Sequence, residues 1–323
     1  MGIELVWKAV LQWPVLLLGW LLGMRAIGAA GTRAMPSGSG AAAVAFARAA
    51  HLAASTRAVT PVAAVVVPVA VSMAVQESIA PSEVFTHFPA GMAYGALPPA
   101  LLAAALVAVP LGCGTGRLGA WASAIAVPAA AFVLLRPPGL RDGGPQLLAV
   151  AAASLGALAP RAGASPATRR AAALPFASWW LLFALASGMV LLSGFAKLAI
   201  ALGALSATAA TLAVAAFAGC APVLTNGTAA CLATAFVACI FVGQGYDEAG
   251  MPRAAWWLLS FAPAASVLGR IPALRSHPRL AAALEAGLPM VLAIVALAVA
   301  LAAIGLPGSA APGDEGAYGL AAP

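Results

Sequence analysis

Apolar segments long enough to cross a lipid bilayer recur along the whole chain, and they decide what it can fold into. A transmembrane helix needs about 20 mainly apolar residues to cross roughly 30 Å of hydrocarbon. The segment 286–306 meets this requirement most clearly. Only 8% of the 323 residues are charged and the mean hydropathy is +1.01, whereas a soluble domain carries about a quarter charged residues. The sequence predicts an all-α, polytopic integral membrane helix bundle.

We expect about ten transmembrane helices, within a range of nine to eleven. The apolar run 171–218 is about twice the needed length, so we divide it into two spans with a hairpin tip at 193–197. Residues 1–306 are then one transmembrane domain, and the Gly-, Pro- and Ala-rich tail 307–323 is predicted to be disordered. The predicted span cores are 9–24, 58–75, 90–112, 118–135, 145–160, 173–193, 198–217, 225–243, 254–269 and 286–306.

The distribution of Lys and Arg predicts the orientation, because cytoplasmic loops are enriched in these residues. With the N-terminus outside, eleven of them fall in cytoplasmic segments and five in external ones. This ratio favours an N-out and C-out topology. The cytoplasmic group is Arg25, Arg33, Arg48, Arg57, Arg117, Arg161, Arg169, Arg170, Arg270, Arg275 and Arg279, and the external group is Lys8, Arg136, Arg141, Lys197 and Arg253.

The segment 25–57 between the first two spans forms a predicted cytoplasmic loop and helix. Residues 31–40 are a flexible link, and 41–57 is an Ala-rich helix candidate with Arg48 and His51. The helix candidate has three interpretations: an extension of the second span, an interfacial helix, or an eleventh span. A buried Arg48 would cost at least about 2.5 kcal/mol, which argues against the eleventh span.

No catalytic, metal or cofactor signature is found in the sequence. The four cysteines form no CxxC pair and have no nearby histidine, so neither zinc nor a disulfide framework is indicated. The segment 112–117, GCGTGR, lacks the lysine and spacing of a phosphate-binding loop and is typical of a tight turn. Basic residues are scattered singly through loops, which argues against nucleic acid and leaves the lipid bilayer as the expected partner.

Two polar loops on the external side carry the first group of candidate site residues. Glu77 lies in the polar stretch 76–87, where Glu83 and His87 have the i, i+4 spacing that can share a cation or a proton. Asp247 and Glu248 follow the eighth span on the same side. We hypothesise that the two loops converge into an acidic vestibule that gathers cations or an amine-bearing ligand. The alternative is that both are solvated turns.

The segment 219–228, GCAPVLTNGT, supplies the second group of candidates on the cytoplasmic side. One interpretation is a broken or re-entrant helix in which Thr225, Asn226 and Thr228 contact a substrate. The other is a hairpin with an Asn-Gly turn. Lys197 would be functional at membrane depth, but at a hairpin tip it only extends toward headgroups.

No Asp or Glu falls near the middle of any predicted span, which argues against ion-coupled pumping. We therefore expect a transporter-like permease for a small neutral or lipophilic solute. The alternatives are a non-catalytic scaffold or complex subunit that packs against membrane partners or copies of itself, and a membrane enzyme acting on lipid. Abundant Ala, Gly, Pro and Arg indicate a GC-rich bacterial genome and hence the bacterial cytoplasmic membrane.

Overall fold

The structure, a computed structural model, describes residues 4, 7–33, 62–86, 93–112, 117–135, 169–218, 226–271, 274 and 277–304. Every regular element within these ranges is a helix. The predicted span 145–160, the helix candidate 41–57 and the tail 307–323 lie outside them. In chain order the elements are η1 (Trp7–Leu11), α2 (Gln12–Arg33), η2 (Val62–Val66), α4 (Val67–Glu77), η3 (Glu83–Phe85), α5 (Leu97–Gly112), α6 (Arg117–Leu134), α8 (Arg169–Leu192), α9 (Ala196–Phe217), α10 (Asn226–Gly245), α11 (Arg253–Phe261), η4 (Ala262–Arg270) and α12 (Pro278–Ile304).

Four of the described helices are long and apolar enough to cross a membrane, and they match four of the predicted spans. They are Ala173–Leu192, Ala196–Phe217, Asn226–Gly245 and Ala283–Ile304. Four shorter apolar helices coincide with other predicted spans: Trp7–Leu22, Val62–Glu77, Leu97–Leu111 and Trp121–Leu134. The fold class of the prediction is therefore confirmed as an all-helical protein with several helices suited to a membrane.

The predicted span 254–269 differs from a continuous α-helix. The structure has nine residues of α-helix in α11, followed directly by nine residues of 3₁₀-helix in η4. Pro263 has no N–H for the α-helical ladder, and the N–H of Ala262 already donates to the Leu259 carbonyl, three residues back. At their usual rises the two segments together extend roughly 30 Å.

Helices α8 and α9 form an antiparallel hairpin, with the turn in the predicted tip of the long apolar run. Ser187 Oγ donates to the Ala199 carbonyl at 2.7 Å, and Ser206 Oγ donates to the Trp180 carbonyl at 3.0 Å. These bonds join the helices at two levels. The backbone turns at 193–195, with Gly194 at φ +95°, and α9 begins at Ala196.

The described helices of the bundle run in two opposite directions between two ends. The α8–α9 turn defines the Glu77 end, where α4, α8 and α10 finish and α5, α9 and α11 start. The opposite end, where α6 begins at Arg117, is called the Arg117 end. Helix α6 finishes at the Glu77 end, because Phe132 near the end of α6 contacts Phe241 near the end of α10, at 6.3 Å between ring centroids.

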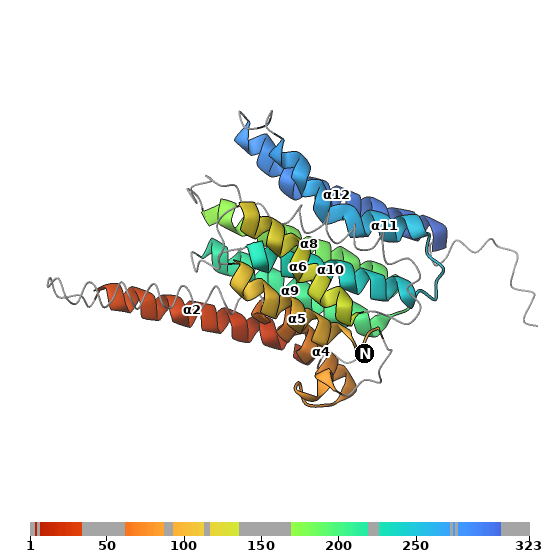
Figure 1. The fold of residues 1–323 in the computed structure, drawn as a ribbon, viewed down its shortest axis with the longest axis horizontal. Helices are drawn as coiled ribbons and strands as arrows, with labels where there is room; N and C mark the ends of the chain where they lie inside the picture. The colour runs from red at the N-terminus through yellow and green to blue at the C-terminus, as the bar shows by residue number, and fades with distance from the viewer. Residues whose placement is uncertain are drawn as a thin grey trace, which may run out of the picture.

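Helix α10 occupies the centre of the bundle (Figure 1), and α11 and α12 lie together at one edge while α2 extends along the opposite edge. Every residue of α10 from 227 to 243 is buried, because α5, α6, α8, α9 and α11 all pack against it. By contrast α12 exposes Val291, Ile294 and Val295. A helix that is apolar all round belongs in the interior, and an exposed apolar face suits contact with lipid.

Aromatic rings fill the space around α10. Phe236 of α10 contacts Trp179 and Phe183 of α8, with ring centroids 6.0 and 5.5 Å away. On another side Phe241 contacts Trp257 of α11 edge to face at 6.2 Å. These arrangements are favourable for the ring quadrupoles and fix the rotation of α10 relative to its neighbours.

The contact between η4 and α12 requires a glycine at position 269. A Cβ there would lie 2.6 Å from the Ala281 carbonyl oxygen and 2.7 Å from the Glu285 nitrogen, both backbone atoms that cannot turn aside. A Cβ added at Gly287 in α12 would have no neighbouring heavy atom within 4 Å. The first glycine is therefore needed for packing and the second is not.

We predict that Gly269→Ala destabilises the protein by about 1–3 kcal/mol, because the added methyl group forces η4 away from α12. Gly287→Ala is the matched control and should be neutral or stabilising, since Ala favours helix by up to about 1 kcal/mol. The midpoint of thermal unfolding of the purified variants in detergent measures both. Equal midpoints for Gly269→Ala and the wild type would contradict the described packing.

Candidate functional site

Three segments that are distant in sequence meet around the α8–α9 turn at the Glu77 end. Buried Ser193 donates its hydroxyl to the Val190 carbonyl at 2.7 Å, and its own carbonyl accepts the backbone N–H of Glu248 at 3.1 Å. A Cβ at Gly194 would lie 3.4 Å from Glu248 Oε2. The loop after α10 is therefore held directly against the turn.

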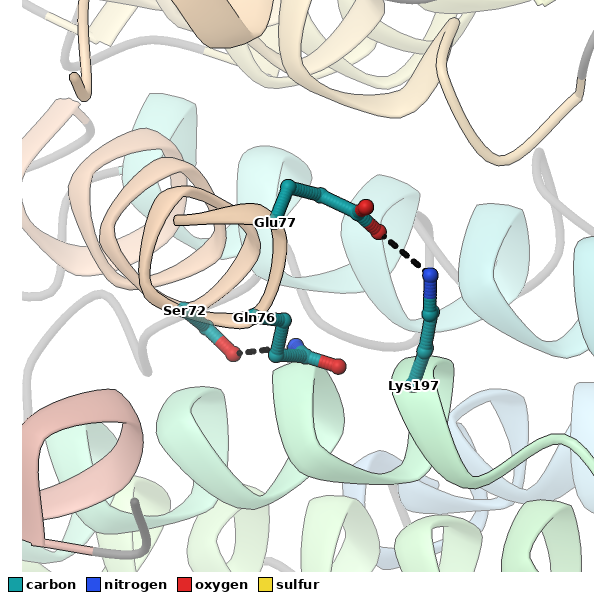
Figure 2. A network of polar contacts seen from close by, with 4 residues as sticks. All are labelled: Ser72, Gln76, Glu77 and Lys197. Carbon is teal, nitrogen blue, oxygen red and sulfur yellow. Dashed lines mark hydrogen bonds and ion pairs between the residues drawn. The ribbon is translucent and has the colours of Figure 1, made fainter. Parts of the chain in front are cut away.

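An ion pair connects the same turn to α4. Lys197 Nζ, in the first turn of α9, lies 2.7 Å from Glu77 Oε1, and their side chains are 54% and 19% exposed (Figure 2). Gln76 Nε2 donates to Ser72 Oγ at 3.1 Å, one turn deeper in α4. Because Lys197 is half exposed, solvent screens the pair, and we expect it to contribute about 0.2–1 kcal/mol. The position at a helix start agrees with the hairpin-tip interpretation of Lys197.

Three aromatic rings pack beside this ion pair. Phe195 lies 5.2 Å from Tyr94 and 4.6 Å from Tyr246 between ring centroids. The loop before α5 is thereby joined to the α8–α9 turn and to the end of α10.

Asp247 organises the loop between α10 and α11. Its carboxylate accepts the backbone N–H groups of Ala249 at 3.1 Å and Met251 at 2.8 Å, and the indole N–H of Trp256 at 3.2 Å. Glu83 has a similar local role, since its Oε2 accepts the Ala80 N–H at 3.2 Å. Both carboxylates thus stabilise their own loops.

The structure brings Glu77, Asp247 and Glu248 to the same end of the bundle, around the α8–α9 turn. Glu83 lies in η3, in the loop that follows α4. Glu77 pairs with Lys197, and Glu83 and Asp247 accept hydrogen bonds from their own loops. Among the described residues, the side-chain carboxylate of Glu248 has no such partner. His87 lies outside the described residues, so the predicted Glu83 and His87 pair stays a prediction, as does the vestibule.

The second group of candidates lies at the Arg117 end. Asn226 and Thr228 form the first turn of α10, and Thr225 lies outside the described residues. The side-chain oxygen Oδ1 of Asn226 is buried and accepts no hydrogen bond. Of this segment only the start of α10 is described, so the re-entrant interpretation of 219–228 stays a prediction.

Two hydroxyl groups in the interior have no hydrogen-bond partner. Ser123 of α6 and Thr234 of α10 are both 0% exposed, and neither hydroxyl oxygen makes a hydrogen bond. Three other buried hydroxyls in the described helices bond to a carbonyl of the preceding turn: Thr208 to Ala204 at 2.8 Å, Thr211 to Ala207 at 3.0 Å and Ser260 to Trp256 at 2.8 Å. An unpaired buried hydroxyl costs about 1–3 kcal/mol, so this pair is an exception that needs a reason.

Sequence reasoning did not select Ser72, Gln76, Tyr94, Ser123 or Thr234. The only signal for the last two was a hydroxyl inside an apolar span, which most often bonds to its own helix backbone. Only the three-dimensional packing distinguishes Thr234 from Thr208. Among the described residues, no three His, Cys, Asp or Glu side chains gather in a way that could hold a metal ion.

In comparisons with known proteins, no family model, no curated protein and no solved structure matches this chain.

We predict that Asp247→Ala destabilises the protein by about 1–3 kcal/mol, because the N–H groups of Met251 and Trp256 lose their acceptor. Glu248→Ala is the control at the neighbouring position and should change stability by less than about 0.5 kcal/mol. Thermal unfolding monitored by tryptophan fluorescence measures both and also reports on Trp256. Similar losses in the two variants would contradict the assigned role of Asp247.

Proposed function

We propose that this chain is a ten-span, multi-pass permease for a small neutral solute, oriented N-out and C-out in a bacterial cytoplasmic membrane. The proposal rests on the alternation of the described helices, on the charges at the two ends of the bundle and on unpaired polar atoms in the interior. The unpaired polar atoms in the interior are the observation that favours a permease.

The alternation supports ten crossings. Nine helical units in the described ranges run in alternate directions, apart from one break: α6 finishes at the Glu77 end, whereas α8 starts at the Arg117 end. One further crossing, as expected for 145–160, would restore the alternation and place both termini on one side.

The charges at the two ends support the orientation. Among described residues, the backbone places seven basic residues and one acidic residue toward the Arg117 end. The Glu77 end has three basic and five acidic residues. Since Lys and Arg accumulate on the cytoplasmic side, the Arg117 end is assigned to the cytoplasm. The first set is Arg25, Arg33, Arg117, Arg169, Arg170, Arg270, Arg279 and Glu285, and the second is Lys8, Lys197, Arg253, Glu4, Glu77, Glu83, Asp247 and Glu248.

The pairing of central helices supports the comparison with transporters built from inverted repeats. In a division into two sets of five, α4 and α9 are both the second helix of their set, and α5 and α10 are both the third. Each helix packs against its counterpart and runs in the opposite direction. This is the relation that a pseudo-two-fold axis in the membrane plane would produce.

Unpaired polar atoms on and beside the central helix favour a permease over a scaffold. A protein that only packs against partners gains nothing from unpaired hydroxyls in its interior and loses stability to each of them. Here Asn226, Ser123 and Thr234 carry such atoms on α6 and α10. Selectivity for a neutral solute can be provided by groups of this kind, without charge.

We predict that vesicles containing the purified protein equilibrate glycerol at least several-fold faster than protein-free vesicles of the same lipids. Light scattering after a hyperosmotic jump in a stopped-flow instrument measures the rate. The cation choline, which is of similar size, should be excluded, because a charge would be desolvated in an interior without counter-charges. Glycerol rates equal to those of protein-free vesicles would favour the scaffold instead.

We also predict opposite accessibilities for two introduced cysteines in a variant without the native ones. Ser82→Cys, exposed in the loop after α4, should react with a membrane-impermeant maleimide in intact cells. His277→Cys, exposed just before α12, should react only after the membrane is permeabilised. Reaction of both cysteines in intact cells would contradict the assigned topology.

A further inference from the structure

We infer that η4 and the first turn of α12 bind an anionic phospholipid at the Arg117 end, with Arg270 and Arg279 at the level of its headgroup. This inference goes beyond the proposed function and needs no transport. Only the leaflet, the cytoplasmic one, is taken from the proposed orientation. Helix η4 continues α11, which lies with α12 at one edge of the bundle (Figure 1), where lipid has access.

Helix η4 separates buried residues from exposed ones in rows. A 3₁₀-helix has three residues per turn, so residues at i and i+3 lie directly above one another. Exposed Val267 is in register with Arg270, and exposed Leu268 is in register with Ile271, which is also exposed. We call these two the outward rows. The third row is buried and consists of Pro263, Ser266 and Gly269.

The outward rows have about the length of one leaflet. The nine residues of η4 extend about 18 Å at the usual rise of about 2.0 Å per residue. Half of the hydrocarbon core of a bilayer is about 15 Å. Because Arg270 is the last residue of η4, the apolar part of the rows lies at the depth of acyl chains and the arginine at the depth of the phosphate groups.

The contact with α12 places a second arginine at the same depth. A Cβ at Gly269 would lie 2.6 Å from the Ala281 carbonyl oxygen, so the two backbones touch there. Arg270 is one residue beyond this contact and Arg279 two residues beyond it, both toward the Arg117 end. At the usual rises of the two helix types, both arginines are about 2–3 Å past the contact. One headgroup can therefore meet both.

The charge and the exposed side chains at this level favour an anionic lipid. Glu285, whose backbone nitrogen lies against Gly269, supplies one negative charge against the two arginines. Leu268 and Leu280, which flank the contact between η4 and α12, are 49% and 50% exposed. Basic residues between helices on the cytoplasmic side are suited to anionic headgroups. A free phosphate would use the arginines alone, whereas a phospholipid also covers the two leucines.

Native mass spectrometry of the purified protein in detergent tests the site. We expect dioleoyl phosphatidylglycerol to bind several-fold more tightly than dioleoyl phosphatidylcholine, which has the same acyl chains and no net charge. Arg270→Gln and Arg279→Gln should each weaken phosphatidylglycerol binding about fivefold, the factor for one basic residue near an anionic headgroup. Arg117→Gln is the control, because Arg117 begins α6 at the same end and α6 packs against α5 and α10.

Three results of this titration would overturn the site. The first is equal affinity of the wild type for the two lipids. The second is an equal loss in Arg117→Gln and Arg270→Gln, which would show a general attraction to the basic end. The third is displacement of phosphatidylglycerol by an equal concentration of inorganic phosphate, which would assign the arginines to a free anion.

A second readout locates the lipid without any variant. Phosphatidylglycerol with a photoactivatable diazirine in one acyl chain, in vesicles of phosphatidylcholine, should label η4 and the first turn of α12 more than the exposed face around Val291 and Ile294. The matching phosphatidylcholine probe should label both surfaces alike. The same labelling pattern from both probes would contradict the inference. Neither readout measures transport, so an absence of glycerol flux would count against the permease and leave the lipid site standing.

Discussion

The constraint on which this fold depends is that hydrocarbon offers no hydrogen bonds, so a polar group within it loses free energy unless it finds a partner inside the protein. Helices meet this constraint for the backbone. For side chains, Ser187 and Ser206 bond to carbonyls across the α8–α9 hairpin, and Thr208 and Thr211 bond to their own helix. Such bonds explain how a chain with so few charges can carry hydroxyls through its apolar helices without losing stability.

In the part of the chain that the structure describes, the backbone places the charged residues toward the two ends of the bundle, and some of them join helices there. Lys197 and Glu77 connect α9 to α4, and Asp247 holds the loop that leads into α11. These contacts use groups that remain close to water. The Glu77 end is thus held by polar contacts around one turn, while the interior is held by rings and small side chains packed on α10.

The sequence predicted the helical class and the positions of the four described helices that are long and apolar enough to cross a membrane, because long uncharged runs have few alternatives. It also predicted the break in the run 171–218, because that run is about twice the length that one transmembrane helix needs. It did not predict the 3₁₀-helix after Phe261, which depends on Pro263 and on the close approach of Gly269 to α12. Nor could it predict that Glu77 pairs with Lys197, 120 residues away, because that contact exists only once α4 and α9 are packed.

The candidate site was the least predictable feature for the same reason. In sequence Thr234 and Thr208 are equivalent, each a hydroxyl among alanines in an apolar span, and a threonine in a helix normally bonds to the carbonyl four residues back. Thr208 does so and Thr234 does not. The free energy lost by an unpaired hydroxyl on the most buried helix is recovered if a solute supplies the missing bond. If the chain is the permease proposed above, unsatisfied hydrogen-bonding groups of this kind would provide selectivity that charged groups do not.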